Sequence, residues 1–134
     1  MSKLFVDTNV FIYDIDKSSK YNAEANKTLN SVYRLFTTTK NISEFFAVLT
    51  KMDVNRDSIL AYFQEIKENV EILYPDRNSL ELFENLIRKY EVKGNQVYDL
   101  VIVSIILSHN IKLVSTFNRK DFSGIKEVEI YEVF

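Results

Sequence analysis

Acidic side chains beside apolar segments are the residues in this chain whose types and spacing could do chemistry. They are Asp7, Glu44, Asp99 and Asp121. Clustered carboxylate oxygens suit hard cations such as Mg²⁺ or Mn²⁺ rather than zinc or iron. A divalent ion lowers the pKa of a bound water and stabilises charge on a phosphodiester during in-line attack. If these side chains gather in one place, they predict metal-dependent hydrolysis of a phosphate ester.

Each of these acids also has a structural interpretation, which for Asp121, as for Asn118, is that of a turn residue. Asp7 or Asn9 can cap the short helix that follows. Asn41 and Glu44 have the spacing of a capping box, in which the glutamate reaches back to the backbone of the cap residue. An ionised Asp99 beside a long apolar segment is costly unless a helix N-terminus or a cation compensates, which favours a site role. The structural and chemical roles can coexist.

The composition of the 134 residues excludes several other chemistries. The chain has no cysteine, so zinc ribbons, disulfides and thiol nucleophiles are excluded. Its two glycines cannot form a phosphate-binding glycine-rich loop. The single histidine, His109, lies in a pattern typical of a turn after a helix, which favours a structural role over that of a catalytic base.

Length and hydropathy favour a globular protein. We expect one domain over residues 1–134, since 46% of the residues are hydrophobic and 13% aromatic. The apolar run 100–107 is too short to span a membrane, and the N-terminus lacks a signal-peptide pattern, so we expect a soluble, cytoplasmic protein with no membrane partner. The formal net charge of −2 is a point against a nucleic-acid-binding protein, which usually has a basic surplus.

Apolar segments alternate between strand-like and helix-like patterns along the chain. Strands are predicted at 4–6, 35–38, 70–74, 112–116 and 127–133. Helices are predicted at 10–14, 20–31, from 41 onward, 56–69, 79–90 with Asn78 as its cap, and 97–107. This alternation predicts an α/β protein with a parallel sheet covered by helices on both faces. The acids then lie where such sheets bind ligands, beyond the carboxyl ends of the strands, provided that the first and fourth strands are neighbours.

Four segments together resemble the PIN domain family, and most closely the VapC-type ribonuclease toxins of toxin–antitoxin pairs. They are 6–10 (VDTNV), 42–45 (ISEF), 98–100 (YDL) and 115–122 (STFNRKDF), in the family's order. The resemblance covers almost the whole chain. It implies a three-layer α/β/α fold with a five-stranded parallel sheet in the order 3-2-1-4-5, and Mg²⁺- or Mn²⁺-dependent endoribonuclease activity.

The resemblance also implies roles for individual residues. Asp7 and Asp99 correspond to the principal metal ligands, and Glu44 to an acid that helps to position the metal or its water. Thr8 and Asn9 would orient Asp7 through hydrogen bonds.

The fourth acid of the motif is where the chain departs from its relatives. Many relatives have aspartate where this chain has Asn118, and Asp121 three residues later is the alternative for that place. We therefore treat Asn118 and Asp121 as joint candidates, and the departure leaves the binding of a second metal open.

The partners implied by the resemblance are RNA, an antitoxin protein and a second copy of the chain. Three basic residues near the expected crevice could contact RNA phosphates or could be solvated loop charges: Lys40, Arg119 and Lys120.

Two other functions compete with the nuclease. A PIN-like fold that only binds RNA or protein is one, and the Asn118 substitution keeps it open. The other is a phosphatase of the haloacid dehalogenase type, which needs an acid two residues after its nucleophile, where this chain has Asn9.

Overall fold

A five-stranded sheet forms the centre of the structure, a computed structural model that describes residues 2–132. Every strand pairs in parallel with its neighbours, in the order β3-β2-β1-β4-β5. The strands are β1 (Lys3–Val6), β2 (Arg34–Thr38), β3 (Glu71–Leu73), β4 (Leu113–Ser115) and β5 (Glu129–Ile130). The expected parallel sheet and its strand order are confirmed, and the first and fourth strands are neighbours.

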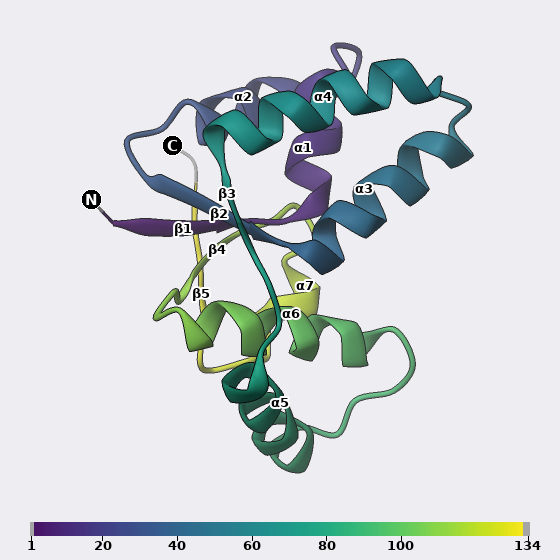
Figure 1. Ribbon diagram of the computed structural model, residues 1–134. Coiled ribbons are helices and arrows are strands. Elements are labelled where there is room, and N and C mark those ends of the chain that lie inside the picture. The colour runs from purple at the N-terminus through teal and green to yellow at the C-terminus, as the bar shows by residue number, and fades with distance from the viewer. Residues whose placement is uncertain (1, 133–134) are drawn as a thin grey trace.

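Helices cover the sheet on both faces, as Figure 1 shows. One layer consists of α1 (Thr8–Ile15), α2 (Asn22–Leu29), α3 (Thr39–Lys51) and α4 (Arg56–Asn69). The other consists of α5 (Arg77–Lys89), α6 (Gln96–Ser108) and the short α7 (Lys120–Ser123). The predicted three-layer fold is therefore confirmed.

The middle strand separates two hydrophobic cores because successive side chains of a strand point to opposite faces. Leu4 and Val6 pack into the core beneath α1 to α4, whereas Phe5 packs into the core beneath α5 to α7. All three side chains are completely buried. Burial on both faces explains why this segment is apolar throughout rather than alternating.

The apolar segment near residue 100 is a helix, although its residues would favour a strand by propensity. Five of its side chains are at most 2% exposed: Leu100, Ile102, Val103, Ile105 and Ile106. A helix enclosed by the sheet and by α5 can be apolar on nearly every side. Within residues 2–132, no helix has the length and apolar character needed to cross a lipid bilayer.

The expected cap at Asn41 is wrong. The α3 helix follows β2 without a loop, and its N-cap is Thr38, whose side chain accepts the Asn41 N–H. The Asn41 side chain is therefore turned into the protein. Glu44 does not close a capping box on Asn41, and its carboxylate instead accepts a hydrogen bond from Thr8.

Other element boundaries also differ from the prediction, most of them by one or two residues, and the cap of α5 and the extent of the last strand differ in particular. Asp76, not Asn78, caps α5, in a capping box with Ser79. The last strand covers only Glu129–Ile130 of the predicted 127–133, of which residue 133 lies outside the described residues.

Candidate metal centre

The centre of the site is Asp7, which follows β1 directly and caps α1. Its Oδ1 accepts the Thr8 N–H at 2.9 Å, so the structural role considered for this residue is present. Its backbone N–H donates to the Ser115 carbonyl at 2.9 Å, which ties this residue to the end of β4. The side chain is only 7% exposed. A cap in this position also directs the carboxylate to the carboxyl edge of the sheet, where ligands bind in such folds.

Two further side chains hold the Asp7 carboxylate. Asn41 Nδ2 donates to Oδ1 at 2.9 Å, and Thr116 Oγ1 donates to Oδ2 at 2.7 Å. Asn41 is fully buried, and the Thr38 hydroxyl fixes its amide by donating to Oδ1 at 2.6 Å. Sequence reasoning missed both Asn41 and Thr116 as site residues. No local pattern distinguishes Asn41, because its partner lies 34 residues earlier in the chain.

Asn9 joins α1 to the segment after β4. Its Nδ2 donates to Thr116 Oγ1 at 3.3 Å, and its Oδ1 accepts the Phe117 N–H at 3.1 Å. Its contact with the Asp7 carboxylate is at the distance limit of a hydrogen bond, 3.5 Å. Asn9 therefore positions Asp7 chiefly through Thr116.

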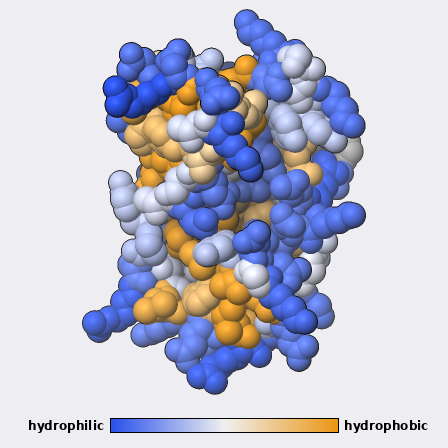
Figure 2. Space-filling view, turned by 90° about the vertical axis from the view of Figure 1, so that its right-hand side faces the viewer, coloured by the Kyte–Doolittle hydropathy of each residue, from blue (hydrophilic) through white to orange (hydrophobic). Residues whose placement is uncertain are grey.

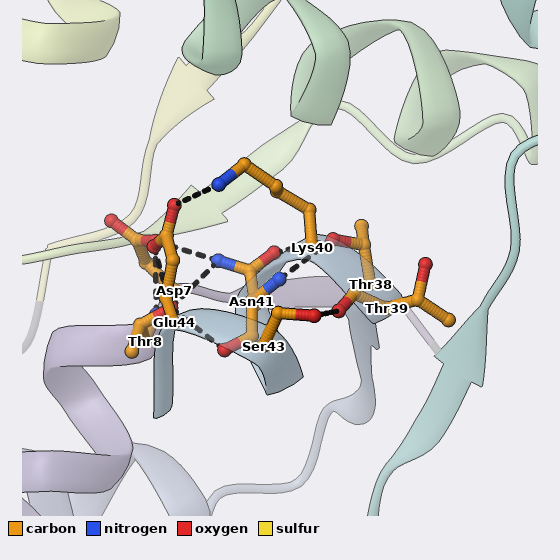
Figure 3. Close-up of polar contacts among 8 residues, drawn as sticks. All are labelled: Asp7, Thr8, Thr38, Thr39, Lys40, Asn41, Ser43 and Glu44. Atoms are coloured by element: carbon orange, nitrogen blue, oxygen red, sulfur yellow. Dashed lines mark hydrogen bonds and ion pairs between the residues drawn. The ribbon is translucent and has the colours of Figure 1, made fainter. Parts of the chain in front are cut away.

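Glu44 approaches the site from α3 with both of its oxygens engaged (Figure 3). Oε2 accepts the Thr8 hydroxyl at 3.1 Å, and Oε1 lies 3.2 Å from Lys40 Nζ. The ammonium group also lies 4.3 Å from the centre of the Tyr98 ring. A charged lysine in this position partly neutralises the acids around it.

Asp99 lies in the first turn of α6 and is half-buried. Its pKa is raised to about 7, and burial of the carboxyl group is the largest cause. The charges of Asp121, Asp7 and Glu44 raise it further, while Lys40 opposes them. The acids expected to meet are therefore close enough to repel one another.

The pKa of Asp7 is also raised, to about 6, mainly because the carboxyl group is buried. The hydrogen bonds from Thr116 and Thr8 lower the pKa, and the charges of Glu44 and Asp121 raise it again. Two carboxyl groups with pKa values near neutrality at one site are typical of a place where a cation compensates the charge.

Asn118 and Asp121 both line a cavity of about 280 Å³ beside Asp7 and Glu44. Asn118 is exposed, and its backbone N–H donates to Thr116 Oγ1 at 3.0 Å. Asp121, in α7, is the one whose charge raises the pKa of both Asp7 and Asp99. This difference favours Asp121 as the source of the fourth charge.

The three basic candidates differ in their relation to the acids. Lys40 lies among them, as described above. Arg119 lies 3.8 Å from the Glu132 carboxylate, and Lys120 is exposed at the start of α7.

The donor set fits a hard divalent cation, because it consists of carboxylates that repel one another. In the part of the chain that the structure describes, no three acidic or histidine side chains are placed to hold one ion together as they lie. An ion bound here would therefore keep water ligands or draw side chains inward, and Mg²⁺ usually keeps several waters.

Comparison with known proteins identifies the family. The profile of the PIN domain matches residues 4–128. The comparison with curated protein sequences found no match.

Solved structures with the same fold include VapBC-1 from nontypeable Haemophilus influenzae, with a TM-score of 0.71, 24% identity and 97% of each chain covered. VapC20 from Mycobacterium tuberculosis, described as a toxin that cleaves the sarcin–ricin loop, has a TM-score of 0.74 at 13% identity, over 91% of this chain and 95% of that one. A toxin–antitoxin complex from Klebsiella pneumoniae has a TM-score of 0.68 at 22% identity, over 98% of this chain and 100% of the other. At these identities the structural likeness shows the fold alone. Since the family profile covers nearly the whole sequence and the sheet has the expected order, the chain belongs to the PIN domain family.

Proposed function

We propose that the protein is an Mg²⁺- or Mn²⁺-dependent endoribonuclease that acts as the toxin of a type II toxin–antitoxin pair. The proposal is supported by three acids that line one cavity, Asp7, Glu44 and Asp121. Their charges help to raise the pKa of Asp99 to about 7, and the pKa of Asp7 is itself raised to about 6. Such a group of carboxylates is costly without a cation. A cation at this place suits hydrolysis of a phosphodiester.

The residues that would hold the ion are Asp7 and Asp99, with Glu44 and Asp121 assisting. The bound ion would lower the pKa of a water ligand and stabilise charge on the phosphate. The hydrogen bonds from Asn41 and Thr116 keep the Asp7 oxygens in place before anything binds. Thr8 does the same for Glu44. Lys40 supplies a positive charge at the same edge of the sheet, where it is suited to contact a substrate phosphate.

The toxin role is supported by the solved relatives. The structure from Klebsiella pneumoniae is described as a toxin–antitoxin complex, and VapC20 from Mycobacterium tuberculosis is described as a toxin. We propose that this chain forms a homodimer in the cytoplasm and is inhibited by a small antitoxin protein.

The test is RNA digestion by the purified chain with Mn²⁺ or Mg²⁺, compared with the same reaction in EDTA. We expect cleavage that needs the metal and is lost in Asp7→Asn and Asp99→Asn. Glu81→Gln is the matched control, because it removes an exposed acid on α5, outside the site. Unchanged cleavage by Asp7→Asn would show that the site is wrong. Metal binding and RNA binding without cleavage would favour the binding module instead.

A further inference from the structure

The cavity beside the acids continues past them, between α1 and α3. Its lining includes the acids Asp7, Glu44 and Asp121 together with the apolar residues Ile12, Tyr13 and Val48. Its volume of about 280 Å³ is close to the roughly 300 Å³ at which small-molecule pockets begin. One cavity therefore combines a cluster of charges with an apolar wall.

Helical spacing explains why the wall adjoins the acids. Residues four apart lie on the same face of a helix, one turn away from each other. Val48 is thus one turn beyond Glu44 on α3, and Tyr13 is one turn beyond Asn9 on α1. Val48 is 37% exposed, so part of the wall faces solvent. Figure 2 views the molecule from the side of the strands' carboxyl ends, and hydrophilic groups cross the middle of this face with hydrophobic groups on either side.

The ring of Tyr13 is held in place by two neighbouring rings. Its centre lies 5.0 Å from that of Tyr21 and 5.1 Å from that of Phe117, and these two rings are 4.8 Å apart. Phe117 is itself fixed to the site by its N–H, which donates to Asn9. Tyr13 is therefore a preorganised aromatic side chain at the wall of the cavity.

We propose that this wall, made of Ile12, Tyr13 and Val48, binds one unstacked nucleobase next to the phosphate at the acids, an inference that rests on the proposed function. A nucleobase has apolar faces that pack on aromatic and aliphatic side chains, and a polar edge that needs hydrogen-bond partners. The Asn118 amide on the rim of the same cavity is suited to that edge. A base in a duplex is stacked on both sides, so the wall would take a base that is free of such stacking.

The experiment compares a fluorescein-labelled uridine dodecamer with an abasic dodecamer, which has the same phosphates and no bases. Binding is measured by fluorescence anisotropy with Mn²⁺, in the Asp99→Asn chain so that the RNA stays intact. Stacking of one base on an aromatic side chain corresponds to about fivefold to about a hundredfold in affinity. We expect the parent to prefer the uridine dodecamer to this extent, and Tyr13→Leu to bind both oligomers equally.

Two further variants separate this role from loss of folding. Val48→Asn changes a partly exposed position and leaves the aromatic cluster intact, and we expect it to reduce the preference as well. Leu60→Asn is the control, since Leu60 is 46% exposed on α4 and does not line the cavity. Equal binding of the two oligomers by the parent, including no binding of either, overturns the proposal.

The base pocket and the nuclease can fail separately. If the unaltered chain with Mn²⁺ cleaves no RNA, the proposed function is wrong. If it cleaves RNA but both wall variants keep the parent's preference, only the base pocket is wrong. A kept preference together with a changed oligomeric state would assign the wall to a second copy of the chain.

Discussion

At the scale of single residues, the site depends on polar side chains that hold the acids rather than on the acids alone. Asp7 is buried, and three hydrogen bonds to its carboxylate come from Thr8, Asn41 and Thr116. A buried carboxylate that loses a partner keeps its desolvation cost without compensation. The supporting residues should therefore matter nearly as much as the proposed metal ligands.

Asn41→Ala tests this dependence. The change leaves both Asp7 Oδ1 and the Thr38 hydroxyl with one partner fewer in a fully buried place. We expect a loss of about 1–3 kcal/mol in the free energy of unfolding, together with weaker Mn²⁺ binding. Urea unfolding and calorimetric titration measure the two effects. Asn30→Ala, at an exposed position, should stay within about 0.5 kcal/mol, and an equally small effect of Asn41→Ala would contradict the assigned role.

The raised pKa of Asp99 gives the metal-free protein a particular pH dependence. The pKa of Asp99 is about 7 in the folded protein, whereas in the unfolded chain it has the ordinary value of 3.8. The folded state therefore binds the proton more tightly than the unfolded state. Protonation therefore stabilises the fold, and this stability is lost as pH rises from about 4 through about 7. In EDTA at about pH 8 we expect Asp99→Asn to melt at a higher temperature than the unaltered chain.

Thermal unfolding across the pH range provides the comparison. The difference in melting temperature between Asp99→Asn and the unaltered chain should shrink toward about pH 5, where Asp99 is protonated in the folded state. It should also shrink when Mn²⁺ is added at about pH 8, because the ion stabilises the unaltered chain. A difference that is constant with pH would show that Asp99 is not the group responsible.

Some of these residues could be recognised from the sequence and others could not. Asp7 and Asp99 could be recognised because a charged side chain beside an apolar segment is costly unless a partner compensates it. Asn41 and Thr116 are ordinary polar residues until the fold brings them to Asp7, from 34 and 109 residues away. Prediction stops where a role depends on a contact between distant segments.

At the scale of elements, the type of every helix and strand except the short α7 was predicted, and the first residue of an element was less predictable. The apolar α6 was correctly predicted as a helix from its length and from the strand that follows it. The predicted start of α3 was wrong because β2 leads directly into this helix. Thr38 is both the last residue of β2 and the N-cap of α3. The composition of a segment indicates how deeply the segment is buried. Which residue caps a helix depends instead on the path of the backbone before the helix.

The α5 helix offers a direct test of the cap. Asp76 accepts the Ser79 N–H at 2.8 Å in the structure, whereas the sequence suggested Asn78. Asp76→Ala should lower the free energy of unfolding by about 0.5–2 kcal/mol, and Asn78→Ala should have a much smaller effect. Urea denaturation of both variants settles the matter, and the reverse order of effects would restore the sequence interpretation.

At the scale of the whole molecule, the site exists only when both helical layers are packed on the sheet. Asp7 and Glu44 come from the side of α1 and α3, whereas Asp99 and Asp121 come from α6 and α7. Their meeting depends on β4 lying beside β1, which the alternation of helices and strands leaves open and which the resemblance to the PIN domain supplied. A metal ion at this place would connect the two layers.

The formal net charge of −2 also bears on the proposed binding of RNA. Without a basic surplus, long-range attraction is weak, and affinity must come from the metal, from base contacts and from a few cations near the site. If Lys40, Arg119 and Lys120 each neutralise one phosphate, log K should fall with log salt at a slope of about −2 for single-stranded RNA. A strongly basic nucleic-acid-binding protein would have a much steeper slope.

Lys40→Gln tests how much Lys40, a cation that lies among the acids, contributes to the proposed binding of RNA. In the Asp99→Asn chain with Mn²⁺, titration of the uridine dodecamer at several salt concentrations should give a slope shallower by about 0.7, because one phosphate contact is lost. The same variant should bind Mn²⁺ more tightly, since the ammonium group that competes for Glu44 at 3.2 Å is gone. Lys67→Gln, on the exposed surface of α4 and away from the acids, is the matched control and should change neither quantity. An unchanged slope with tighter metal binding would make Lys40 a counter-ion of the acids that does not touch RNA.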